Sequence, residues 1–133
     1  MAFGITVHRR SDDGLFQAPP ANVYSEEFDR WIKDVQARWL YENPLGAGGT
    51  VFDWWHKPAH EIGLPLVGAI YNEGLRVTDA DLDRLSRELD ALERFWDGAD
   101  LSQELRDHLQ ESLGYLREAI RIALECDGIL VIS

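Results

Sequence analysis

Two long apolar stripes between Val77 and Gly128 constrain this chain more than any other feature. Apolar residues recur every three or four positions, first over 79–97 and then over 101–126, which is the spacing of amphipathic helices. Because the connection at 96–99 is short, the two stripes are expected to face each other in an antiparallel helical hairpin. A zipper between two chains is the alternative interpretation of the same leucines.

Short polar residues predict where these two helices begin and end. Thr78 is expected to cap the first helix and Asp100 the second, because such side chains accept hydrogen bonds from unpaired N–H groups at a helix start. Gly98 is expected to end the first helix in the left-handed conformation that glycine adopts most easily.

Strands are expected near both ends of the chain. Residues 3–8 alternate apolar and polar side chains, which predicts a strand with one buried face and places His8 on the exposed face. Residues 15–18 are expected to return as a second short strand after a turn. Residues 129–132 form an unbroken apolar run that suits a strand covered on both faces. The strand order stays open.

A further amphipathic helix is expected over 26–42, with Ser25 as its N-cap and Pro44 just beyond its end. A glycine-rich stretch, 45–50, follows and is interpreted as a flexible connector. A phosphate-binding loop would need a Gly-Lys-Ser/Thr ending, or a place between a strand and a helix.

A short buried helix is expected over 64–71, with Pro65 in its first turn and Gly74 at its end. With the other elements it predicts one mainly helical α+β domain over 1–133. In that fold the hairpin at about 79–126 and one further long helix pack with a small sheet made of N- and C-terminal strands.

The charge of the chain indicates its classes of partner. The net charge is −11, and residues 78–133 alone carry fourteen acids and six arginines. Such a surface repels nucleic acid and anionic lipid, so neither is an expected partner, whereas a basic protein would be attracted. An inhibitor of the immunity-protein kind, which blocks a basic toxin or nuclease, is one concrete version by analogy of size and charge. Simple solubility is the alternative explanation.

A cytoplasmic location is expected. No apolar run approaches the roughly 18 residues of a membrane span, and the N-terminus lacks the pattern of a signal peptide. The single cysteine, Cys126, cannot form a disulfide within the chain, which fits a reducing compartment.

The only constellation that suggests chemistry is at 54–61. His56 and His60 are four positions apart, so on a helix both imidazoles could bind one divalent metal, with Glu61 or a distant carboxylate as third ligand. However, Pro58 is expected to place His56 ahead of the helix, which would separate the two rings. Ordinary, partly buried histidines are the alternative interpretation.

Aromatic residues in the same part of the chain could form a small-ligand pocket. Trp54 and Trp55 would be its walls, His56, His60 and Glu61 its polar groups, and Tyr71 would project into it from the short buried helix. Core filling is the alternative for both tryptophans. No catalytic set is predicted, so a non-enzymatic protein that binds a protein partner is the preferred hypothesis. The alternative is a ligand- or metal-binding protein, which could be an enzyme, with its site in residues 50–73. Monomer and homodimer are both left open.

Overall fold

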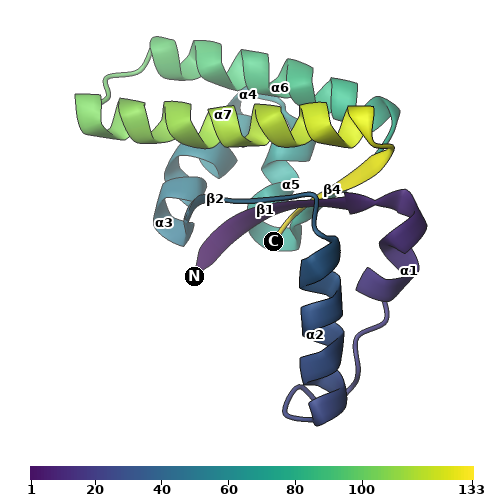
Figure 1. The fold of residues 1–133 in the computed structure, drawn as a ribbon. Coiled ribbons are helices and arrows are strands. Elements are labelled where there is room, and N and C mark those ends of the chain that lie inside the picture. The colour runs from purple at the N-terminus through teal and green to yellow at the C-terminus, as the bar shows by residue number, and fades with distance from the viewer.

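The computed structural model describes residues 1–133 and contains a four-stranded antiparallel sheet with helices packed against it (Figure 1). The order of the strands is β2-β1-β4-β3, with bounds β1 (Ala2–Arg9), β2 (Tyr41–Ala47), β3 (Leu75–Val77) and β4 (Gly128–Ile132). The α-helices are α1 (Asp13–Phe16), α2 (Glu26–Arg38), α3 (Gly48–Val51), α4 (Lys57–Ile62), α5 (Pro65–Glu73), α6 (Ala80–Asp97) and α7 (Gln103–Glu125). A 3-10 turn, η1 (Arg10–Asp12), and a π turn, η2 (Phe52–His56), complete the chain. The predicted mainly helical α+β fold is confirmed.

The predicted helical hairpin is α6 and α7, which pack side by side; α7 lies over one face of the sheet, and α6 packs on α7 and α5 (Figure 1). Leu85, Leu89 and Leu116 of the two stripes are fully buried, so the leucines pack within one chain. Across the hairpin, Arg117 of α7 donates a hydrogen bond to Glu93 of α6 at 3.2 Å. None of the helices combines the length and the apolarity that crossing a membrane requires.

The predicted capping residues of the hairpin are wrong. The residue before α6 is Asp79, not Thr78, and no side chain caps this helix start. The cap of α7 is Ser102, whose Oγ accepts the backbone N–H three residues on at 3.2 Å, and Asp100 lies in the connection. Gly98 has a φ of −87°, in the right-handed region. Competing polar residues stand within two positions of each other at both helix starts, which is why spacing alone misplaces the caps.

Residues 41–47 form strand β2, where the sequence predicts the end of a helix and a flexible connector. The preceding helix ends at Arg38 because the chain then turns to pair with β1, and the Leu40 N–H donates to the Val7 carbonyl at 2.8 Å. β2 is an edge strand, and an edge tolerates Pro44, which has no N–H to donate. The rest of the glycine-rich stretch begins α3.

The short strand predicted at 15–18 is also wrong, because the chain forms the single helical turn α1 there. This turn places the Phe16 ring against the His8 ring, stacked with centroids 3.9 Å apart. His8 is therefore only 2% exposed, in contrast to the exposed position predicted for it.

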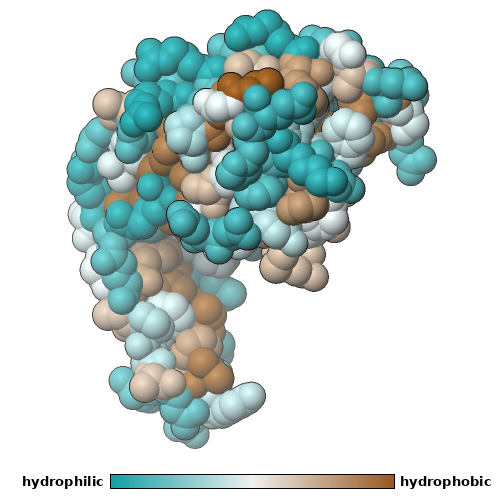
Figure 2. All heavy atoms as spheres, turned by 180° about the vertical axis from the view of Figure 1, so that it is seen from behind, coloured by the Kyte–Doolittle hydropathy of each residue, from teal (hydrophilic) through white to brown (hydrophobic).

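Helix α2 projects away from the sheet, on the side opposite the α6–α7 hairpin (Figure 1). Ser25 caps it as predicted, accepting the Phe28 N–H at 3.1 Å. Its Trp31 indole donates to the Leu15 carbonyl at 2.9 Å, which ties the helix to the segment before it. Only Val35 of α2 is buried, and Figure 2 shows apolar side chains on the surface of this projecting arm.

The predicted short buried helix is α5, with Pro65 as its first residue and Gly74, at a φ of 72°, as its C-cap. Its N-terminus is capped by a side chain from a different helix. The Glu88 carboxylate of α6 accepts the N–H groups of Leu66 and Val67, each at 3.0 Å. A buried carboxylate thus satisfies donors that α5 itself leaves unpaired.

Candidate functional site

The segment with the predicted constellation is one continuous helical stretch from α3 through η2 to α4. Within it, the Lys57 N–H bonds the carbonyl of Phe52, five residues back, which defines the π turn. Pro58 explains the wider turn, because it has no N–H to continue an ordinary α-helical ladder. The prediction that Pro58 places His56 ahead of the helix is therefore wrong: the chain widens and continues.

The two tryptophans of the π turn have different surroundings. Trp55 is fully buried and meets Trp96 of α6 edge to face, with ring centroids 5.2 Å apart. Trp54 is partly buried, and its backbone carbonyl accepts the Trp96 indole N–H at 2.7 Å. In an unbroken α-helix the Trp54 carbonyl would face the missing N–H of Pro58, so the indole replaces that donor.

The continuous helical stretch brings the two predicted histidines together, because they are four positions apart. The rings of His56 and His60 have centroids 4.4 Å apart. His56 also lies 5.4 Å from the Phe52 ring and 5.3 Å from the Tyr71 ring, centroid to centroid. On its other edge, His56 Nδ1 is 3.1 Å from the Gly68 carbonyl of α5. His56 is thus fixed in place by α5, whereas the exposed His60 has no hydrogen-bond partner.

A cleft of about 500 Å³ lies between α4 and α5 beside this pair. The residues that line it are Ala59, His60, Gly63, Leu64, Pro65, Gly68, Ala69, Asn72 and Glu73. Of the six predicted ligand-binding residues only His60 lines it. Trp54, Trp55, His56 and Tyr71 lie outside it, and so does the exposed Glu61. No group of three or more His, Cys, Asp or Glu side chains is arranged to hold a metal ion.

A second candidate site is a row of carboxylates at the start of α7, which we name the acidic row. It consists of Asp100, Glu104, Asp107 and Glu111, which are all exposed and form no ion pair. The steps of three and four place the helical members on one face of α7. The neighbouring Arg106 turns instead toward the hairpin connection, where it donates to a backbone carbonyl at 3.3 Å.

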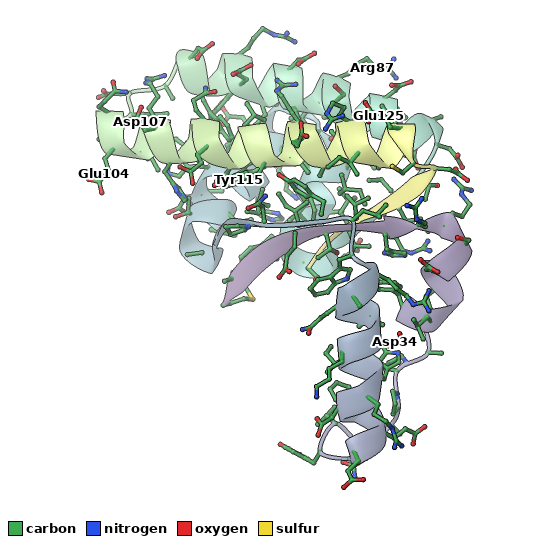
Figure 3. All side chains as sticks on the ribbon, viewed as in Figure 1. Asp34, Arg87, Glu104, Asp107, Tyr115 and Glu125 are labelled. Carbon is green, nitrogen blue, oxygen red and sulfur yellow. The ribbon has the colours of Figure 1, made fainter.

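The other half of α7 has its charges neutralised. Arg121 makes ion pairs with Glu118 and Glu125, which raise the pKa of the guanidinium and lower that of Glu118. Figure 3 labels Glu104 and Asp107 at one end of α7 and Glu125 near the other. The surplus negative charge of this helix is therefore concentrated toward its N-terminal end.

A tyrosine adjoins the acidic row (Figure 3). The Tyr115 hydroxyl donates to Glu111 at 3.1 Å, and this hydrogen bond to a carboxylate raises the pKa of the phenol. The Tyr115 backbone carbonyl accepts the hydroxyl of Tyr41 from β2 at 2.9 Å, and burial raises the pKa of Tyr41. The row therefore continues into an aromatic patch where α7 crosses β2.

A third cluster, on the sheet face opposite the hairpin, was missed by reasoning from the sequence. His8 Nε2 lies 2.8 Å from Asp13, whose other oxygen pairs with Arg76 of β3 and accepts from Gln17 at 2.7 Å. A small hollow of about 270 Å³ adjoins these side chains. Partial burial raises the pKa of Asp13, but the bonds and charges of Arg76 and His8 outweigh this effect and lower the pKa overall. The cluster links α1 to both β1 and β3.

Comparison with known proteins identifies no relative: no protein-family model, no curated protein and no solved structure matches this chain.

Proposed function

We propose that this protein binds a basic protein partner through the acidic row of α7, and that binding rather than catalysis is its role. The observation that carries the proposal is the set of four exposed carboxylates without a cation of their own at one end of a long helix. Elsewhere in the hairpin most acids already pair with arginines, as Asp90 and Glu93 do with Arg117. The acidic row is thus the part of the hairpin whose negative charge is not neutralised by an arginine of the same chain.

The local geometry supports recognition of lysine and arginine side chains. Carboxylates spaced along one helix face can accept several charge-assisted hydrogen bonds from a basic surface. Tyr115 adds a partly buried ring at the end of the row, and an aromatic face attracts an ammonium or guanidinium group. Since α7 is held to α6 and to the sheet, the row is presented by a rigid element, which reduces the entropy lost on binding.

One concrete form of this proposal is a cytoplasmic inhibitor of the immunity-protein kind, which would cover the positive surface of a toxin or nuclease. Its support is the net charge of −11, the small size and the placement of the acidic row. Electrostatic complementarity of this kind accelerates encounter and discriminates against other partners.

The test is a variant that neutralises the row: Asp100→Asn, Glu104→Gln, Asp107→Asn and Glu111→Gln. Its control changes the net charge by the same amount at four scattered, exposed acids that also lack ion pairs: Glu42→Gln, Glu61→Gln, Glu73→Gln and Asp83→Asn. Both variants and the wild type are used to capture partners from lysate at low and physiological salt, and the association rate of each purified partner is then measured.

We expect the wild type and the control variant to capture basic partners that the row variant does not capture. Association with the row variant should be slower by about tenfold or more at low salt, with a weaker salt dependence, because steering by charge is lost. If the row and control variants bind the same partners with the same salt dependence, the acidic row is not the binding surface.

A further inference from the structure

We infer that His56 and His60 form a two-imidazole site for a divalent late first-row transition metal, of the class of Ni²⁺, Cu²⁺ and Zn²⁺. This site is independent of the acidic row and goes beyond the proposed function. It rests on three features of the contact region between α5 and the π turn: the proximity of the two rings, the proton position on His56, and the rigid packing of that ring.

The hydrogen bond of His56 settles which of its nitrogens can bind a metal. A backbone carbonyl can only accept, so the 3.1 Å contact with Gly68 requires that His56 Nδ1 carries the proton. In the neutral ring, Nε2 then holds the free lone pair. In metal-binding histidines the nitrogen that does not bind the metal commonly donates its N–H to a backbone carbonyl. This hydrogen bond fixes both the tautomer and the direction of the ring.

The separation of the rings suits a shared ion. Two imidazoles that bind one metal at about 2.0–2.1 Å and at near right angles have centroids roughly 4.5 Å apart. The observed distance between the centroids of His56 and His60 is 4.4 Å. His60 is exposed and makes no hydrogen bond, so a small change in its side-chain torsions can direct a nitrogen at the ion without breaking a hydrogen bond.

The surroundings of His56 make it a preorganised ligand. Its ring is packed beside Phe52 of the same π turn and beside Tyr71 of α5, and the turn itself follows from Pro58. Single π turns in helices frequently occur at functional sites. Since α5 supplies the Gly68 carbonyl, the position of the first ligand is set by the packing of α5 against the π turn rather than by a surface rotamer.

The donor set predicts which ions bind. Imidazole nitrogens favour Cu²⁺, Ni²⁺ and Zn²⁺, whereas Mg²⁺ and Ca²⁺ prefer oxygen ligands. Glu61 follows His60 directly, so it faces about 100° away on the helix and does not join the pair. Water therefore fills the remaining positions, and the three-ligand site predicted from the sequence becomes a site with two protein ligands.

The experiment is titration of the untagged protein with Ni²⁺, followed by calorimetry and by the NMR signals of the four histidine rings. We expect one ion per chain, with paramagnetic broadening of His56 and His60 ahead of His8 and His108. His60→Gln should weaken binding by about tenfold or more. Mg²⁺ should not compete, and acidification should release the ion, because only the neutral imidazole binds.

Two variants serve as controls. His108→Gln removes another exposed histidine, and Glu61→Gln removes the neighbouring carboxylate, so both should bind Ni²⁺ like the wild type. His60 makes no hydrogen bond within the fold, so His60→Gln should keep the circular dichroism spectrum and melting temperature of the wild type. Absence of Ni²⁺ binding to the wild type, or unchanged binding by His60→Gln, would overturn the inference. Neither result would bear on the acidic row.

Discussion

The carboxylate of Glu88 is expected to be one of the most important polar groups for the stability of this fold. It is 9% exposed and accepts the first free N–H groups of α5, those of Leu66 and Val67, while sitting on α6. In Glu88→Ala the buried N–H of Val67 and the partly buried N–H of Leu66 lose their acceptor, and each charge-assisted bond contributes about 1.5–3 kcal/mol. Because the two losses overlap, we expect a decrease of about 3 kcal/mol in the free energy of unfolding.

The assay is urea unfolding at neutral pH, with thermal melting alongside, where a loss of this size corresponds to roughly 10 °C. Glu88→Gln retains one acceptor oxygen and should lose about 1 kcal/mol. The matched control is Asp83→Ala, an exposed acid on the same helix without an ion pair, which should change stability by no more than about 0.5 kcal/mol. If Glu88→Ala unfolds at the same urea concentration as Asp83→Ala, the carboxylate does not cap α5 and the reasoning fails.

Two further predictions concern the sheet and the helices. The pKa of Asp13 is lower in the folded protein than its ordinary value, so folding favours the charged carboxylate. The stabilisation that Asp13 contributes is therefore complete above pH 3.8, its ordinary pKa, and is lost as the pH falls through the lower pKa of the folded state. Asp13→Asn should remove that part of the pH dependence from unfolding curves recorded between neutral and acid pH. Gly74→Ala should destabilise the protein by about 2 kcal/mol or more, because φ is 72° and the new Cβ would lie 2.9 Å from the Ile132 carbonyl oxygen. Gly114→Ala lies in open space within α7 and should stabilise the protein by up to about 1 kcal/mol. Chemical denaturation checks both, since the two changes in the free energy of unfolding should have opposite signs.

The elements that could be predicted from the sequence are those with a sustained apolar period. The α6–α7 hairpin, α5, β1 and β4 each carry such a pattern, and the structure confirms them. Strand β2 could not be predicted, because Pro44 and Gly46 interrupt its pattern and its stability comes from pairing with β1. The capping of α5 by Glu88 was equally hidden, since the two partners are 22 residues apart in the chain.

The candidate sites show the same limit. The proximity of His56 and His60 follows from their spacing. The expectation that the helix begins only near Pro58, after His56, was wrong because the Trp96 indole that compensates for the missing N–H of Pro58 lies on a distant helix. His8 was misplaced because one helical turn, α1, covers a face that alternation marks as open. Contacts between segments far apart in the sequence decide both cases, and no local pattern records them.

The pairing of β1 with β4 has a consequence for the order in which the molecule assembles. These two strands occupy the middle of the sheet, yet they come from opposite ends of the described chain. Joining them closes a very long loop, and the chain loses this entropy before the contacts between the strands can stabilise the pairing. Local units such as the α6–α7 hairpin are therefore expected to form earlier on the folding pathway. Amide protons of β1 and β4 then exchange with solvent only when the whole molecule opens, while those of the projecting α2 exchange through local openings that leave the sheet intact.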